Sequence, residues 1–254
     1  MRHAIAPLAL FAAATLSLAA CSHRSPLLEP TPEELLTPGP DSFRVEFQTT
    51  RGPFLVMAHR DWSPFGVDRF YFLVSHGYYD DTYFFRVIKG FVAQWGISGN
   101  PLVNDAWRHR TIGDDPVVRS NQPGMIAFAR SGPHSRSVQL YVNYRDNARL
   151  DTLGGFGFPP IAQVIQGMNV VDSLYAGYGE GPPKGTGPSQ DSIEKAGNAY
   201  LTRKFPRLDR ILSARVTESW GDTLSASMTL RRGYPDMRRR GRGGFDRVGD
   251  GGGR

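Results

Sequence analysis

The chain has a single cysteine among its 254 residues. One cysteine cannot form an intrachain disulfide framework or a multi-cysteine zinc or iron–sulfur site. The six histidines include no HExxH pair, which excludes a zinc protease of that type. The sequence also lacks a GxSxG elbow and the GxxxxGK[ST] order of a phosphate-binding loop. We therefore expect neither a metal nor a cofactor.

A strong charge is missing from the part of the chain expected to fold. The formal net charge is +6, but residues 231–254 hold eight Arg against three Asp, and Arg2 and Arg24 are the only charged residues of 1–24. Residues 25–230 are therefore close to neutral, so we expect no nucleic-acid partner. A hydrophobic content of 40% with 11% aromatic residues is typical of globular protein and excludes wholesale disorder.

The first 21 residues have the pattern of a bacterial export signal. A short basic start precedes an apolar run from Ala4 to Ala20. The run ends in Leu18–Cys21, which resembles the lipobox of bacterial lipoproteins and predicts Cys21 as a lipid anchor on a membrane. With Ser22 rather than Asp beside the anchor, we expect the periplasmic face of the outer membrane in a Gram-negative cell. An ordinary cleaved signal with an incidental cysteine is the alternative.

Two segments outside the central part are unlike folded protein. Residues 22–41 contain five prolines and predict a semi-rigid extended tether that sustains no helix or strand; a leader without a role is the alternative. Residues 218–254 form a C-terminal extension whose Arg/Gly-rich part predicts disorder. Such a tail can bind RNA, but for an exported chain we favour a solvated tail, or attraction to an anionic envelope surface.

Residues 42–217 predict one mainly β domain. Ser63 reads as an N-cap with Pro64 in the first helical turn, and apolar spacing predicts a helix that ends near Gly77. A second helix is predicted over Met168–Tyr175, and an ordered addition over 197–209. Short apolar segments predict strands at 43–47, 54–58, 83–88, 91–95, 124–129, 138–142, 161–165 and 211–216. Many short strands with two helices indicate a closed or nearly closed antiparallel barrel.

One strand–turn–strand segment, 84–96, carries unusual polar residues. Arg86 lies within an apolar strand, a turn follows, and Gln94 lies on the returning strand. This geometry brings the two side chains close enough to share one groove. On this segment alone, an arginine pointing into solvent is the simpler interpretation.

The order of the motifs gives a more specific interpretation. Residues 84–96 (FFRVIKGFVAQWG) resemble the FHRVIxGFxxQGG motif of the cyclophilin family of peptidyl-prolyl isomerases. Further matches in the family's order are 124–133 (GMIAFARSGP), 137–142 (SVQLYV) and 166–172 (QGMNVVD). The resemblance covers about residues 42–217. It implies an eight-stranded antiparallel barrel capped by two α-helices, and catalysis of rotation about the bond before proline.

That rotation has an uncatalysed barrier of about 18–20 kcal/mol and needs no nucleophile, metal or proton base. It needs the resonance of the amide to weaken while the bond twists. A fixed cation that donates a hydrogen bond to the developing lone pair on the proline nitrogen does this in a dry site. Arginine suits the role because it stays charged and its planar fork is rigid.

The resemblance assigns a role to each matching position. Arg86 corresponds to the catalytic arginine, and Gln94 and Gln139 to the glutamines that bind the substrate backbone and position the arginine. The remaining substrate-binding positions, which form the pocket and the floor of the groove, are Phe91, Val92, Ala129, Arg130, Tyr141, Leu150 and Phe158. The apolar members could instead be plain barrel core, and the two glutamines could make purely structural hydrogen bonds.

Several positions depart from the family's pattern. Arg149 stands where cyclosporin-binding members have a tryptophan, which argues for weak drug binding. Phe158 takes the place of the pocket histidine, and Trp95 and Ile97 replace a glycine and an aspartate at the strand end. The Gly177–Gly185 stretch reads as an ordinary loop.

We therefore expect a monomeric prolyl isomerase that acts on proline-containing unfolded or exported polypeptides. The alternative is a non-catalytic chaperone or scaffold that binds proline-containing segments, for which the intact Arg86 is the discriminating residue.

Overall fold

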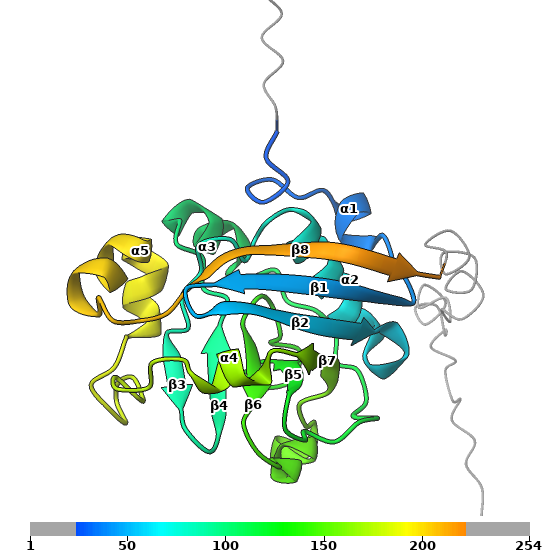
Figure 1. Cartoon of the computed structure of the whole chain (residues 1–254). Helices are drawn as coiled ribbons and strands as arrows, with labels where there is room; N and C mark the ends of the chain where they lie inside the picture. Colours follow the sequence, from blue (N-terminus) through cyan, green and yellow to red (C-terminus); the bar gives the residue numbers. More distant parts are fainter. Residues whose placement is uncertain (1–23, 222–254) are drawn as a thin grey trace, which may run out of the picture.

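Alternating apolar residues place the first two strands on the core. In the computed structural model, which describes residues 24–221 (Figure 1), β1 (Ser42–Thr49) and β2 (Gly52–His59) pair antiparallel. Phe43, Val45 and Phe47 of β1 are fully buried, while the residues between them are partly exposed. This period of two is the pattern of a strand with one face on the core.

The eight strands of residues 24–221 form one antiparallel sheet that curls on itself. The other strands are β3 (Arg86–Ile88), β4 (Val92–Trp95), β5 (Met125–Phe128), β6 (Leu140–Asn143), β7 (Pro160–Gln166) and β8 (Ile211–Trp220). Their order in the sheet is β3-β4-β6-β5-β7-β2-β1-β8. A bridge between Tyr83 and Arg210 joins the segments just before the two edge strands. The predicted mainly β architecture, with eight antiparallel strands, is therefore present in residues 24–221.

The structure has more helices than the two predicted. The described residues contain α1 (Pro32–Leu36), α2 (Pro64–Ser75), α3 (Pro101–Trp107), α4 (Met168–Asp172) and α5 (Gln190–Lys204). Short 3₁₀ helices cover Arg60–Trp62, Ala148–Asp151 and Leu153–Gly155. The expected amphipathic helix over 168–175 is the short α4, and the longest helix is α5. Gly197, with φ of 57°, breaks α5 in the middle, which interrupts the apolar periodicity in the sequence.

The predicted cap of α2 is also different in the structure. Ser63 stands at the N-cap position but makes no side-chain cap. The buried Asp115 accepts hydrogen bonds from the amides of Phe65 and Gly66, at 3.2 and 3.0 Å, and from the Ser63 hydroxyl at 2.5 Å. A carboxylate has two oxygens and a charge for the positive helix end, so it replaces the local serine. The fully buried Arg136 pairs with Asp115 at 2.8 Å.

The prediction of an extended, helix-free tether over 22–41 is wrong for residues 32–36. Pro32 is the first residue of α1, where its missing N–H costs nothing. Thr31 and Glu34 form a reciprocal capping box at that end, with bonds of 2.8 and 3.2 Å. The segment is also attached to the domain: the Trp107 indole donates to the carbonyl of Leu27 at 2.8 Å.

The predicted domain end at residue 217 falls inside β8, which continues to Trp220. The signal segment with Cys21, and residues 222–254 with the Arg/Gly-rich tail, lie outside the described residues. Among residues 24–221, no helix is long and apolar enough to cross a membrane, and no cluster of three or more His, Cys, Asp or Glu could hold a metal ion.

Candidate active site

The site begins at the hairpin of β3 and β4. The two strands pair so that Arg86 lies directly opposite Gln94. The turn between them contains Gly90 at φ of 71° and closes with a hydrogen bond from the Phe91 amide to the carbonyl of Ile88 at 2.9 Å. Side chains opposite each other in a hairpin share one face. The Arg86 Nη1 accordingly donates to Gln94 Oε1 at 3.1 Å.

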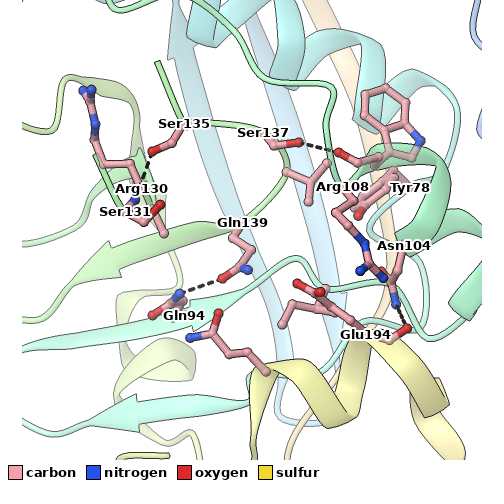
Figure 2. A pocket seen from close by; sticks show the side chains of 15 residues that line it. Tyr78, Gln94, Asn104, Arg108, Arg130, Ser131, Ser135, Ser137, Gln139 and Glu194 are labelled. Atoms are coloured by element: carbon pink, nitrogen blue, oxygen red, sulfur yellow. Dashed lines mark hydrogen bonds between the residues drawn. The ribbon is translucent and has the colours of Figure 1, made fainter. Parts of the chain in front are cut away.

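The second glutamine extends this chain of hydrogen bonds. Gln139 precedes β6, which pairs with β4, and Gln94 Nε2 donates to Gln139 Oε1 at 2.8 Å (Figure 2). Because Arg86 can only donate, it fixes which end of the Gln94 amide faces Gln139. The Gln139 amide NH₂ makes no hydrogen bond to any residue in 24–221, so its donors are available to a bound peptide.

A second hydrogen-bond partner of Arg86 comes from the Gly177–Gly185 stretch, which was expected to be an ordinary loop. Glu180 Oε1 accepts from Arg86 Nε and Glu180 Oε2 accepts from Arg86 Nη2, both at 2.7 Å. The hydrogen bonds from Arg86 lower the pKa of Glu180 below its usual value, so the carboxylate is charged at neutral pH. No local pattern could have identified this residue, because it is 94 positions away along the chain.

The predicted pocket residues gather in one apolar cluster beside Arg86. We call it the site cluster; its members are Phe91, Val92, Ala127, Ala129, Tyr141, Leu150 and Phe158. The strands explain the grouping, since alternate residues of β4, β5 and β6 point to the face opposite the barrel core. The Arg86 guanidinium carbon lies 5.6 Å from the centre of the Phe91 ring. The structure therefore brings the arginine, both glutamines and the apolar residues together.

Tyr141 carries a polar atom into this cluster. Burial raises its pKa well above the usual value, so the phenol stays protonated. Its hydroxyl donates to Asn121 Oδ1 at 2.8 Å. With its polar group satisfied, the ring packs edge-on against Phe158, at 6.1 Å between centres, as an apolar residue would.

The Arg130 side chain does not take part in the site. Its guanidinium turns away from Gln139 (Figure 2), stacks over the Phe156 ring at 4.1 Å and pairs with Asp114 at 2.7 Å. Only its main chain is left to contact a peptide, which is how the resemblance uses this position. Arg149, in contrast, lies over Phe91 at 5.1 Å and is exposed.

Two cavities flank the hydrogen-bonded series Arg86–Gln94–Gln139. One, of about 340 Å³, is lined by Gln94, Ala129 and Gln139, and by Glu194 of α5 on its opposite side (Figure 2). The other, of about 480 Å³, lies between Arg86 and the segment 180–191. From the sequence, Gly177–Gly185 is expected to be an ordinary loop and the ordered addition is expected further along, at 197–209. The position of the segment 180–191 beside the arginine was therefore not predicted.

Comparisons with known proteins agree with this geometry. The family model of cyclophilin-type peptidyl-prolyl cis-trans isomerases matches residues 44–198. The chain belongs to this family. Peptidyl-prolyl cis-trans isomerase B of Escherichia coli (strain K12) is 32% identical over 135 residues, covering 51% of this chain and 82% of that protein. A peptidyl-prolyl cis-trans isomerase of Streptomyces antibioticus is 30% identical over 141 residues, covering 51% of this chain and 81% of that protein.

A solved structure gives the same result for the fold. A cyclophilin-type isomerase of Cryptosporidium parvum superposes with a TM-score of 0.51 at 18% identity, covering 70% of this chain and 99% of that one. At this identity the likeness shows the cyclophilin fold alone. Together, the comparisons confirm the predicted family, fold and peptidyl-prolyl isomerase activity.

Proposed function

We propose that this cyclophilin rotates X–Pro bonds with Arg86 as its catalytic residue, and that its substrates are exported or envelope polypeptides. The observation that carries the catalytic role is the hydrogen-bonded series Arg86–Gln94–Gln139 beside the site cluster. An arginine that points into solvent is the simpler interpretation of the strand alone. Such an arginine would not bond to Gln94, which is itself bonded to Gln139 next to β6.

The chemistry follows from these positions. The site cluster holds the proline ring while the acyl side of the bond turns, and the free amide of Gln139 binds a substrate carbonyl. As resonance is lost, the proline nitrogen gains a lone pair, which accepts a hydrogen bond from Arg86. No covalent bond forms or breaks. Preorganised donors of this kind act on charge that exists only in the transition state, so they raise the rate rather than the affinity.

The test is the Arg86→Ala variant. We expect kcat/KM on a short Xaa-Pro peptide, measured by NMR exchange, to fall by about 100-fold or more. The folded state should persist, because the Arg86 side chain is only partly buried. Arg145→Ala, at an exposed arginine after β6, is the matched control and should keep wild-type turnover.

An Arg86→Ala variant with the full turnover of an active wild type would refute the catalytic role of Arg86. If the wild type itself shows no turnover, the alternative function applies, a scaffold that binds proline-containing segments without catalysis. Peptide binding by both proteins would then be equal, with no exchange enhancement above the uncatalysed rate in either.

The substrate class rests on the N-terminal sequence. The lipobox-like Leu18–Cys21 supports export and lipid attachment, which would hold the domain at a membrane surface where exported chains fold. The mass of the mature N-terminus tests this directly. We expect a diacylated or triacylated cysteine and release of a Cys21→Ala variant from the membrane fraction; an unmodified or earlier-cleaved N-terminus would contradict the proposal.

A further inference from the structure

The Arg86 guanidinium has a different partner on each of its sides. An arginine carries five N–H donors in one plane. Nε and Nη2 each donate to a Glu180 oxygen, and Nη1 donates to Gln94. Two donors remain for a substrate. Because a two-point contact between a planar fork and a carboxylate fixes the plane of both groups, Glu180 decides where those two donors point.

The loop that carries Glu180 is built tightly around its backbone. The Glu180 carbonyl accepts from the amide of Gly187 at 2.9 Å. A Cβ atom on Gly185 would lie 2.2 Å from the same oxygen, so this position accepts only glycine without a shift of the loop. Tyr178, two residues before Glu180, packs edge-on against Phe205 at 5.0 Å between ring centres. The carboxylate is thus presented by a folded loop.

The helix that follows the loop, α5, is anchored next to β3 and β4. Ile193 and Leu201 of α5 are buried in one apolar cluster with Phe85, the neighbour of Arg86. Ile97, two residues after the end of β4, belongs to this cluster too. Both ends of the loop are therefore fixed to the part of the sheet that carries the site.

The ion pair itself adds little to the stability of the fold. The side chains of Arg86 and Glu180 are 20% and 31% exposed, and partly solvated pairs contribute little to folding free energy. Lys184 and Asp191, the other charged residues near the carboxylate, make no hydrogen bond to it within the described part of the chain. The contact between Glu180 and Arg86 has two short hydrogen bonds but adds little to stability. Its role is therefore better explained as orienting the Arg86 guanidinium.

We infer that Glu180 is a positioning residue for Arg86, holding the guanidinium so that its free donors face the site cluster. This inference rests on the proposed catalytic role of Arg86. Without the carboxylate, the long Arg86 side chain keeps a single hydrogen bond within residues 24–221, the one to Gln94, and can rotate out of line. The opposite possibility is an inhibitory counter-ion, whose removal would raise activity.

A double-mutant cycle in the full chain separates these cases. We expect Glu180→Ala to lower kcat by about tenfold or more while KM stays close to the wild-type value, because ångström-scale misplacement of a catalytic group costs up to about 100-fold. In an Arg86→Ala background the same change should have no further effect on residual turnover. Asp191→Asn, which removes a charge from the same cavity, is the matched control and should leave turnover unchanged.

Three outcomes would overturn the inference. Two of them are a wild-type kcat and a higher kcat in Glu180→Ala. The third is an equal loss of turnover when Glu180→Ala is added to the Arg86→Ala background, which would mean a purely structural role. If the alanine variant does not fold, the isosteric Glu180→Gln is tested in the same cycle with the same criteria. Wild-type activity in Arg86→Ala alone would refute the catalytic assignment, a result distinguishable from failure at Glu180.

Discussion

Strands β4, β5 and β6 carry two faces that are both buried but chemically different. The inner face belongs to the barrel core and is apolar apart from the indole nitrogen of Trp95; its residues are Ala93, Trp95, Ile126, Phe128, Leu140 and Val142. The outer face mixes apolar residues with Gln94, and with the Tyr141 hydroxyl bonded to Asn121. A strand face that combines apolar residues with hydrogen-bonding groups is suited to holding a polypeptide, whereas the inner face is suited only to packing.

The two faces also differ in whether their buried polar atoms have hydrogen-bond partners. Trp95 is fully buried, and its indole Nε1 is one of the buried polar atoms in residues 24–221 that lack a hydrogen-bond partner. Its ring nevertheless packs against Phe84 at 5.5 Å and Phe47 at 6.0 Å between centres. The inner face therefore tolerates a lost hydrogen bond in exchange for aromatic packing, while on the outer face the polar groups are bonded in series.

The largest effect is expected on the inner face. Trp95→Ala should lower the free energy of unfolding by about 3–5 kcal/mol, because it leaves a cavity the size of an indole in the core. Denaturant unfolding measures this. Trp220→Ala is the control, since that ring is 42% exposed, and it should cost at most about 1 kcal/mol. Equal losses in the free energy of unfolding for the two variants would contradict the distinction between the buried core and the exposed end of β8.

An intermediate effect is expected at Phe91 on the outer face. Phe91→Ala should lower kcat/KM by about 10- to 100-fold, since gripping a proline ring uses apolar contact worth about 1.5–3 kcal/mol. Its effect on unfolding should be smaller than that of Trp95→Ala because the ring is only partly buried. Steady-state kinetics and unfolding of the same preparation check both. A large stability loss with unchanged kinetics would make Phe91 ordinary core.

The smallest effect is expected for Tyr141→Phe. It removes one buried hydrogen bond, and Asn121 Oδ1 keeps a second donor, Asn143 Nδ2 at 3.2 Å. We expect a loss of about 0.5–1.5 kcal/mol in the free energy of unfolding and nearly unchanged kcat/KM. Tyr79→Phe, whose hydroxyl donates to the carbonyl of Val138 at 3.0 Å from the inner side, should lose a similar amount. A tenfold fall in turnover for Tyr141→Phe would show that this hydroxyl takes part in the reaction.

The site shows which contacts a sequence can predict. Arg86 and Gln94 were paired from the hairpin pattern, because eight residues and one turn decide their distance. Gln139 and the apolar positions followed from motif order, which reflects the fold of a whole family. Glu180 had no such signal: its loop has no periodicity, and its only recognisable property, glycine content, describes the backbone and not what the carboxylate meets.

The sequence by itself determined the strands, α2, and the pairing across the β3–β4 turn, since alternation and turn chemistry act over a few residues. The docking of 24–41, the capping of α2 by Asp115 and the contact between Glu180 and Arg86 were decided by the tertiary structure. Each joins groups roughly 50 or more residues apart, so each exists only after the sheet has curled and brought distant loops to the same place. A pattern over a few neighbouring residues does not indicate which distant loops meet when the sheet closes.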